Sequence, residues 1–270
     1  MLYYMNRLSV IITEPGKDYE LLDSGDGEKL ERYGEYVLRR PDPQALWRKN
    51  LLEKEWNKAN ASFRRDGAKG DWIIKPGLPE RWVIEINGLS FWIHPSSFKH
   101  TGVFPEQAPN WDWMQTTIKK AGRPVSVLNL FGYTGGASLA AAQVGAEVCH
   151  VDGSKVAIRW GQDNAKQSGL SQKPIRWILD DARKFIQREI KRGRKYDGII
   201  LDPPAFGHGP NKELWKIEDD LLLLLQLCKD AMSDKPLFFL INGYASGYSA
   251  ITYENNLRAL FAEGNFEQGE

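Results

Sequence analysis

The sequence predicts an α/β protein with a Rossmann-like parallel sheet and, before it, a smaller β-rich module. From Pro124 onward, short apolar runs alternate with amphipathic segments, which is typical of the βαβ units that build a parallel sheet. Before about residue 100, strand-like runs are separated by turns such as residues 24–27, which is typical of antiparallel pairs. We therefore expect residues 1–100 to form an N-terminal module, a candidate substrate-binding cap, and residues 101–270 to form the larger domain.

The N-terminal part contains five expected strands and one expected helix. Its strands are the runs Leu8–Thr13, Asp18–Asp23, Glu35–Arg40, Arg81–Ile86 and Leu89–Ile93. The pair Asn87-Gly88 between the last two runs predicts a tight hairpin. Apolar residues at helical spacing predict a helix over Ala45–Asn60, and the Arg- and Lys-rich stretch that follows, up to Gly70, predicts a surface loop.

The C-terminal part contains five expected buried strands with a helix after each of the first four. The expected strands are residues 125–131, 146–152, 174–180, 196–202 and 236–243. The expected helices are residues 137–145, 155–169, 182–193 and 214–232. Open parallel sheets bind their ligands at the carboxyl ends of the strands. Candidate functional residues are therefore sought directly after each run.

Composition limits the classes of protein that this chain can represent. The 270 residues are 42% hydrophobic, which suffices for one large and one smaller core. Only two cysteines are present, both in apolar stretches, which disfavours a disulfide framework and predicts a reducing, cytoplasmic environment. The net charge of +1 gives no whole-chain sign of nucleic-acid binding, and the run Leu221–Leu225 is too short to span a membrane. The histidines have no metal-ligand spacing, so we expect no metal site; they are His94, His100, His150 and His208.

The first strand ends in a glycine-rich turn that begins the following helix. Small residues over Asn129–Gly136 let a ligand approach the backbone and the helix N-terminus. A tight turn without a ligand is the alternative interpretation. Asp152 ends the second strand about 20 positions later, where a carboxylate accepts hydrogen bonds from the ribose of SAM or NAD. Asp181 follows the third strand, where it either approaches an adenine amino group or simply caps a helix.

The fourth strand is followed by Asp202-Pro203-Pro204-Ala205-Phe206. The prolines restrict the backbone, so the Asp202 carboxylate and the Pro203 carbonyl can face a substrate, while Phe206 offers a ring for stacking. The alternative is a Pro-Pro pair that merely ends the strand. This run resembles motif IV of class I methyltransferases that act on nucleobases.

Together these motifs identify a wider resemblance over residues 124–242. The stretch is similar to the S-adenosylmethionine (SAM)-dependent methyltransferase domain of the large-subunit ribosomal RNA methyltransferase-like family, whose first motif resembles LNLFGYTGG. The resemblance implies that Asp152 holds the ribose, that Asp181 approaches the adenine, and that Asp202 faces both the cofactor and the acceptor. It implies a methionine-side loop formed by Asn129, Phe131, Gly132, Tyr133, Thr134 and Gly135. The segment Phe98–Gln107 resembles the lead-in of that family, which makes Phe104 and Gln107 expected cofactor contacts.

The chain departs from the general methyltransferase pattern in two places. Phe131 and Tyr133 stand where the general first motif has glycines, and the G-x-G-x-x-G of dinucleotide-binding proteins is absent, which makes NAD less suitable than SAM. Relatives that methylate carbon 5 of cytosine have a nucleophilic cysteine after the fifth strand. Here residues 239–246 contain none, and Cys149 and Cys228 lie elsewhere.

We therefore expect direct methyl transfer to a nitrogen or oxygen, which leaves S-adenosylhomocysteine (SAH). In this interpretation Asp202 orients the acceptor or takes its proton, and Phe206 stacks on it. Asn242 and Tyr244 supply further polar contacts or are ordinary loop residues.

The family resemblance suggests RNA, most simply ribosomal RNA, as the substrate. Basic and tryptophan side chains interleave in the N-terminal part, as in single-strand binding surfaces, although such charges are as often a solvated face. They are Arg39, Arg40, Trp47, Arg48, Lys49, Lys54, Trp56, Lys58, Arg64, Arg65, Lys69 and Trp72. A methyltransferase of a small molecule or protein would share every cofactor motif. A SAM-binding module without activity would be expected to lose the Asp202-Pro203-Pro204 run.

The final residues, 265–270, resemble the start of a sixth strand. We expect the C-terminal strands to be incomplete, with an apolar sheet edge that lowers stability or is covered by another subunit.

Overall fold

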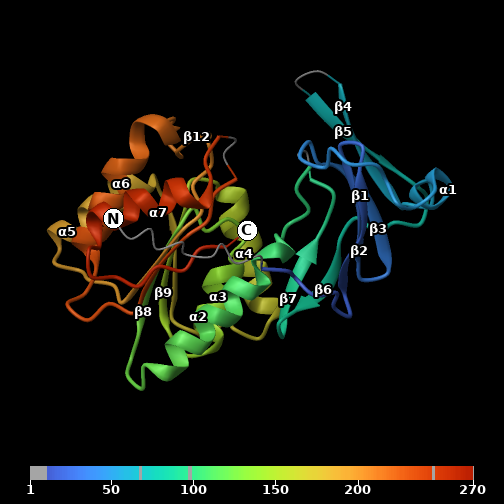
Figure 1. Ribbon diagram of the computed structural model, residues 1–270. Helices are drawn as coiled ribbons and strands as arrows, with labels where there is room; N and C mark the ends of the chain where they lie inside the picture. Colours follow the sequence, from blue (N-terminus) through green and yellow to red (C-terminus); the bar gives the residue numbers. More distant parts are fainter. Residues whose placement is uncertain (1–10, 67–68, 97–98, 245–246, 270) are drawn as a thin grey trace. The chain divides into compact units, whose positions relative to one another are not determined.

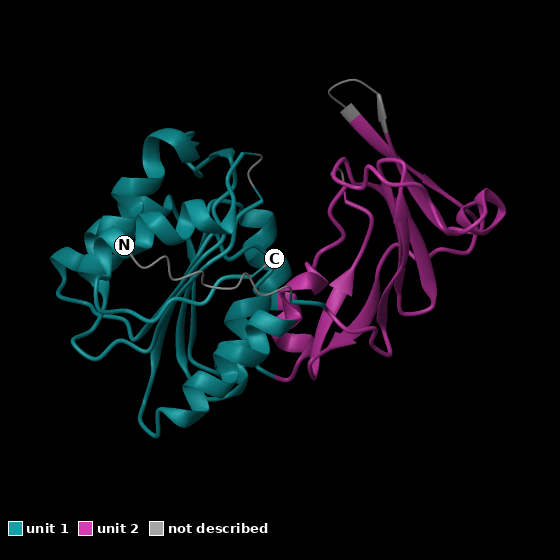
Figure 2. Cartoon of the chain, in the orientation of Figure 1, with its two compact units in different colours: residues 1–12, 109–162, 170–270 teal, residues 13–108, 163–169 magenta. Residues whose placement is uncertain are grey.

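The structure is a computed structural model that describes residues 11–66, 69–96, 99–244 and 247–269 (Figure 1). The chain divides into two compact units (Figure 2). Unit 1 comprises residues 1–12, 109–162 and 170–270, and unit 2 comprises residues 13–108 and 163–169. Within the described part of the chain, no helix combines the length and the apolar character needed to cross a bilayer.

Unit 2 is built on a five-stranded sheet with the strands in sequence order. These strands are β1 (Tyr19–Gly25), β2 (Glu28–Tyr33), β3 (Tyr36–Pro41), β4 (Ala61–Asp66) and β5 (Lys69–Ile74). The pairs are antiparallel except for β3 with β4. β2 was not predicted, and the surface loop predicted up to Gly70 is wrong because this stretch forms β4 and starts β5. The predicted strand Leu8–Thr13 lies mostly outside the described residues, and residues 11–13 form no strand.

The helix predicted over Ala45–Asn60 is also wrong, since only α1 (Glu53–Trp56) is helical. The rest of the segment is bound to the turn between β1 and β2. The Asp23 carboxylate accepts hydrogen bonds from the amides of Asn50 and Leu51 and from the indole of Trp56. The amides of Asp26 and Gly27 donate to carbonyls of residues 47 and 45. These backbone groups are paired across the turn and are not available for helical bonds.

The predicted hairpin is present in unit 2 as β6 (Trp82–Ile86) and β7 (Leu89–Ile93). Asn87 and Gly88 have φ angles of 53° and 70°, as a two-residue turn with two left-handed positions requires. The end of α4 (Lys155–Gln167) belongs to the same unit, and Asn164 Oδ1 there accepts from the amide of Trp92 at 2.9 Å.

Unit 1 contains all five predicted parallel strands, in the spatial order β10-β9-β8-β11-β14. They are β8 (Ser126–Leu130), β9 (Glu147–Asp152), β10 (Ile175–Leu179), β11 (Gly198–Leu201) and β14 (Phe238–Ile241). Helices cover both faces, with α5 (Ala182–Lys191), α6 (Ile217–Ala231) and α7 (Ala250–Leu260) on one side (Figure 1). The other side carries α2 (Ala108–Lys120), α3 (Gly136–Gln143) and the first part of α4. Such a three-layer arrangement explains why the strands are almost wholly apolar.

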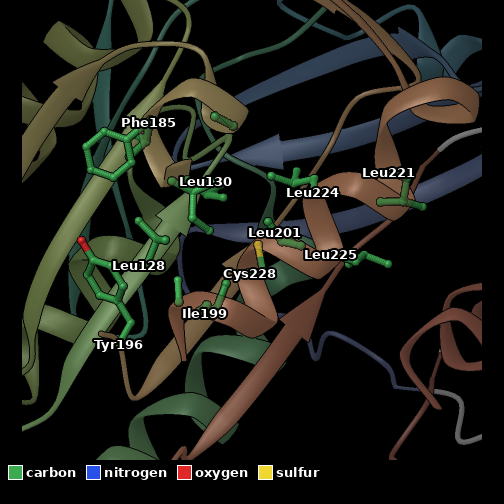
Figure 3. Close-up of a cluster of buried hydrophobic side chains, with 14 of the residues drawn as sticks. Leu128, Leu130, Phe185, Tyr196, Ile199, Leu201, Leu221, Leu224, Leu225 and Cys228 are labelled. Atoms are coloured by element: carbon green, nitrogen blue, oxygen red, sulfur yellow. The ribbon is translucent and has the colours of Figure 1, made fainter. Parts of the chain in front are cut away.

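The core between the sheet and α5–α7 is aliphatic. Leu128, Leu130, Ile199 and Leu201 of the sheet pack against α6, and the Cys228 sulfur lies among them (Figure 3). Alternate residues of a strand point to opposite sides of the sheet. On the side away from α5–α7, β8 and β9 carry polar side chains. This alternation places one row of polar groups beneath α3.

A small antiparallel hairpin was not predicted. β12 (Phe206–His208) pairs with β13 (Leu214–Lys216), directly after the Asp-Pro-Pro run. The helix predicted over residues 214–232 is wrong at its start, because residues 214–216 form β13 and α6 begins at Ile217. The turn residues Gly209, Pro210 and Asn211 were the signal for a hairpin at this position.

Candidate active site

A cavity of about 260 Å³ lies in unit 1 at the carboxyl ends of the strands. Four predicted loops contribute to its wall: Phe131 after β8, residues 151–154 at β9, residues 180–182 after β10, and Asp202 with Pro204 after β11. Gly207, His208, Gly209 and Trp215 of the β12–β13 hairpin complete it, and sequence reasoning missed all four. The predicted motif residues Asp152, Asp181 and Asp202 are thus brought together at one site.

Asp152 ends β9 and is half-buried in the cavity wall. Its two carboxylate oxygens accept hydrogen bonds from the amides of Tyr133 at 2.8 Å and Ser154 at 2.7 Å. Removal from water raises the pKa of Asp152 above its usual value, against the effect of these two amides. Only burial and these two amides shift its pKa, with no cationic partner among the described ion pairs, and two further lone pairs remain for a ligand.

The turn after β8 holds two non-glycine residues in the left-handed region. Phe131 has a φ of 57° and Tyr133 a φ of 49°, which is the backbone conformation that glycine provides in the general motif. The cost of such a conformation is on the order of 1 kcal/mol per residue. The amide of Tyr133 is bound to Asp152, and the ring of Phe131 packs on Trp215 at 5.0 Å, so both residues are held in place.

The glycines of this turn make close contact with aromatic rings. A Cβ at Gly132 would lie 2.4 Å from the imidazole of His150, and a Cβ at Gly135 would lie 3.2 Å from the ring of Trp177. Gly135 also has a φ of 92° and begins α3. Thr134 between them is buried. Packing against the sheet, as well as ligand access, therefore requires small residues here.

Asn129 and His150 form the polar row beneath α3. They face each other in the register of β8 and β9, and both contact Ser138 at 2.9 Å. Burial lowers the pKa of His150 to about 3, so the imidazole is neutral. Its Nε2 atom has no hydrogen-bond partner among the described residues. The Asn129 side chain is therefore engaged inside the protein, and its predicted contact with the cofactor stays a prediction.

Asp181 is the N-cap of α5, as the alternative interpretation held. Its carboxylate accepts from the amides of Arg183 and Lys184 and pairs with the Arg183 guanidinium at 2.9 Å. It also lines the cavity, so a contact with adenine stays a prediction.

The loop after β11 is anchored by its carbonyl groups. Trp215 Nε1 donates to the Pro204 carbonyl at 2.6 Å, and the amide of Ile217 donates to the Ala205 carbonyl at 3.0 Å. Pro203 is buried, Asp202 is half-buried, and Phe206 is 56% exposed. A second, open hollow of about 450 Å³ lies beside Phe206. The anchored loop therefore carries the Asp202 carboxylate and, four residues later, an accessible aromatic ring.

The remaining predicted residues lie in other surroundings. Phe104 precedes the short helix η1 (Pro105–Gln107) and contacts the His100 ring at 5.3 Å. Phe104 and Gln107 belong to unit 2, and their cofactor contacts stay predictions. Asn242 Oδ1 accepts from the Asn110 side chain at 3.2 Å, and Tyr244 is 54% exposed.

Several of the predicted basic residues of unit 2 are paired with acids. Arg39 and Lys49 bind Glu28 and Glu53, and Arg40 is buried against Glu31. Trp56 is fully buried, whereas Trp47 is 56% exposed and the Arg48 side chain 94% exposed. Fewer of these side chains are available to RNA than the sequence suggested. Among the described residues, no group of three His, Cys, Asp or Glu side chains is arranged to hold a metal ion.

Comparison with known proteins assigns the chain to a family. Residues 57–255 match the family model of the S-adenosylmethionine-dependent methyltransferases. The chain belongs to this family. The match confirms the predicted methyltransferase family and SAM as its cofactor.

Two curated relatives are ribosomal RNA large subunit methyltransferases. Methyltransferase K of Neisseria meningitidis is 27% identical over 205 residues, which are 68% of this chain and 53% of that protein. Methyltransferase I of Aeromonas salmonicida is 34% identical over 125 residues, which are 46% of this chain and 31% of that protein. The chain thus spans about half or less of the length of these relatives.

Solved structures confirm the predicted fold class. The SAM-dependent methyltransferase from Agrobacterium tumefaciens has 44% sequence identity and a TM-score of 0.91, over 95% of this chain and 82% of that one. SMU.776, a putative methyltransferase complexed with SAH, has 20% identity and a TM-score of 0.72, over 93% of this chain and 68% of that one. The second likeness concerns the fold alone.

Proposed function

We propose that this methyltransferase transfers the SAM methyl group directly to a nucleobase of RNA, in the first place ribosomal RNA, without a catalytic cysteine. One observation carries the proposal: Asp152, Asp202 and Pro204 line a single cavity in a domain of the SAM-dependent family. SAM supplies an electrophilic methyl group on a positively charged sulfur. Asp202, the prolines and Phe206 bind and orient the acceptor. Asp202 also takes the proton that the attacking nitrogen or oxygen loses when it is methylated.

The cavity suits a cationic cofactor with ribose hydroxyls. The Asp152 oxygens each accept one backbone amide and keep lone pairs for hydroxyl donors. Asp202 adds a second carboxylate to the same wall, which favours a positive sulfonium over a neutral or anionic ligand. We extend the proposed cofactor contacts to Phe104, Gln107, Asp181 and the turn Asn129–Gly135.

The state of both cysteines supports direct transfer. Cys149 lies in β9 and Cys228 in α6, and both are buried. Burial raises the pKa of the Cys149 thiol to about 11 and also raises that of Cys228. Only the thiolate attacks a pyrimidine ring, so neither group is prepared for covalent catalysis at neutral pH.

The choice of RNA is supported by the relatives and by the accessible ring. The matched relatives are named as ribosomal RNA large subunit methyltransferases. Phe206 is exposed beside an open hollow, where an unpaired base can stack. We further propose that residues 1–100 act as the substrate-binding part of the chain.

Calorimetric titration of SAM and SAH tests the cofactor site. Asp152→Ala is expected to weaken binding at least ~10-fold, because hydrogen bonds to a charged group contribute about 1.5–3 kcal/mol. Asp234→Ala is the matched control, because Asp234 is exposed and lies outside the cavity wall. Binding that survives Asp152→Ala would contradict the assignment of the ribose site.

Transfer of a radiolabelled methyl group to ribosomal RNA tests the activity. Asp202→Asn is expected to lower the rate of transfer ~100-fold, within the range of general acid–base catalysis, with little change in SAH affinity. Label that appears in small molecules or protein but in no RNA would overturn the proposed substrate.

A further inference from the structure

The buried indole of Trp215 contacts two of the loops that form the cavity and the first turn of α5. Trp215 lies in the middle of β13 and is 3% exposed. Its Nε1 atom donates to the Pro204 carbonyl at 2.6 Å. Its ring packs on Phe131 at 5.0 Å and lies 5.7 Å from the Arg183 guanidinium.

Each of these contacts reaches a different part of the proposed reaction centre. Pro204 belongs to the loop that carries Asp202, and Phe131 begins the turn that leads to Asp152 through the amide of Tyr133. Arg183 pairs with Asp181, which lines the cavity below α5. The acceptor-binding loop, the cofactor turn and the α5 N-terminus thus share one rigid side chain.

Arg183 fixes the hairpin that carries the indole. Its guanidinium donates to the Leu214 carbonyl at 2.8 Å and pairs with Asp220 at the start of α6. Lys184, the next residue, pairs with Glu213 at 2.8 Å. The β12–β13 hairpin is therefore tied to α5 by charged contacts immediately before Trp215, which hold the backbone that carries the indole.

We propose that Trp215 is a positioning residue, which sets the distance between the acceptor-binding loop and the cofactor turn. The inference rests on the proposed methyl transfer. Trp215 acts through Pro204: its N–H holds the carbonyl, and the carbonyl fixes the backbone between Asp202 and Phe206. Methyl transfer is sensitive to alignment of the acceptor with the methyl–sulfur bond, so a small displacement of this loop lowers the rate.

The variant Trp215→Phe removes the N–H donor and keeps an aromatic ring against Phe131. SAH affinity is expected to stay within about twofold, while kcat for methyl transfer falls roughly tenfold. Tyr196→Phe is the matched control, because the buried Tyr196 hydroxyl also donates a hydrogen bond, to the Glu189 carboxylate at 2.6 Å. It removes a buried donor and keeps the ring in unit 1 outside the cavity wall, and it is expected to leave kcat unchanged.

Hydrogen exchange of the SAH complexes provides a readout that does not depend on activity. In Trp215→Phe, amide exchange is expected to rise at least tenfold over residues 205–208 and at Ile217, whose amide binds the Ala205 carbonyl. Unchanged exchange there, or a kcat that falls equally in both variants, overturns the positioning role. If the wild type binds SAH but methylates no RNA, the proposed function fails, and the exchange result alone decides the inference.

Discussion

Two enclosed carboxylates, Glu31 in unit 2 and Asp152 in unit 1, have opposite surroundings. Glu31 is completely buried. Its oxygens accept two hydrogen bonds from the Arg40 guanidinium and one from each hydroxyl of Tyr19 and Tyr33. Burial alone would raise the pKa of Glu31, but the charges of Arg40 and Lys29 hold it at about 2. Asp152 receives two backbone amides and no cation, and burial raises its pKa.

The two carboxylates differ in their capacity to bind a ligand. A carboxylate that is matched by a buried guanidinium has no capacity left for a ligand, and its removal exposes an unpaired charge. A carboxylate at a cavity wall that has few hydrogen-bond donors lowers the free energy of unfolding, and a bound ligand can offset this loss. Glu31 is therefore expected to determine stability, and Asp152 to determine cofactor affinity.

The largest effect is expected from Glu31→Ala. The change leaves Arg40 buried without its partner, which typically lowers the free energy of unfolding by roughly 3–5 kcal/mol. Urea unfolding followed by tryptophan fluorescence measures it. The double variant Glu31→Leu/Arg40→Met removes both charges and is expected to recover most of the loss. A single variant that loses less than about 1 kcal/mol would show that the pair is not a structural element.

The next effect concerns the close packing of the cofactor turn. In Gly132→Ala the new methyl group would lie 2.4 Å from the His150 ring, so the turn that leads to Tyr133 and Asp152 must shift. We expect SAH affinity to fall ten- to one-hundredfold, which corresponds to about 1.4–2.8 kcal/mol. Calorimetric titration gives the value.

Two further variants define the cause of that loss. Gly16→Ala serves as the control, since a Cβ at Gly16 meets its nearest neighbour at an ordinary 3.7 Å. Gly132→Ala/His150→Ala restores space for the methyl group and is expected to recover part of the affinity. If Gly132→Ala binds SAH normally, ring packing does not hold the turn.

The sequence was sufficient to predict the parallel sheet of unit 1, because strands that are buried on both faces leave a clear pattern. Each of the five parallel strands is a short apolar run, and ligands of such sheets gather where the strands end. Asp152 and Asp202 were found on this basis alone. Phe131 and Tyr133 departed from the glycine pattern, and the structure shows that they adopt the glycine-like conformation all the same.

Unit 2 was predicted less well because its segments are held by contacts distant in sequence. The segment 45–52 has apolar residues at helical spacing, yet its amides bind Asp23, more than 20 residues earlier. Trp215 was missed for a similar reason: the helical pattern of α6 concealed the short hairpin before it. Pairings across a turn leave no periodic signal in the sequence.

A smaller effect is expected when the pH is varied. The ribose hydroxyls need an ionised Asp152, so SAH affinity is expected to fall as the pH drops through the raised pKa of this group, up to tenfold per unit below it. The stability due to Glu31 is present above its unfolded pKa, near 4.5, and is lost only as the pH falls toward 2. Cofactor binding is therefore lost at a higher pH than the stability due to Glu31.

Urea unfolding between pH 7 and pH 2 measures the stability due to Glu31, and calorimetry between pH 7 and pH 4 measures the cofactor affinity. In Asp152→Asn the weak residual binding is expected to be independent of pH over this range. Affinity of the wild type that stays constant down to the ordinary aspartate range would contradict the raised pKa.

The smallest effect is expected from Arg48→Ala, in contrast to the buried Arg40. Arg48 is 94% exposed, and its nearest acid, Asp26, lies 3.9 Å away and is itself 44% exposed. Surface pairs of this kind contribute little, so the free energy of unfolding is expected to change by less than about 0.5 kcal/mol.

If this exposed arginine contacts RNA phosphate, RNA affinity falls about two- to threefold in Arg48→Ala, and the slope of affinity against salt decreases by about one. Filter binding of ribosomal RNA fragments at several salt concentrations measures both values. An unchanged slope would remove Arg48 from the proposed RNA surface and leave the exposed ring of Trp47 as the next residue to test there.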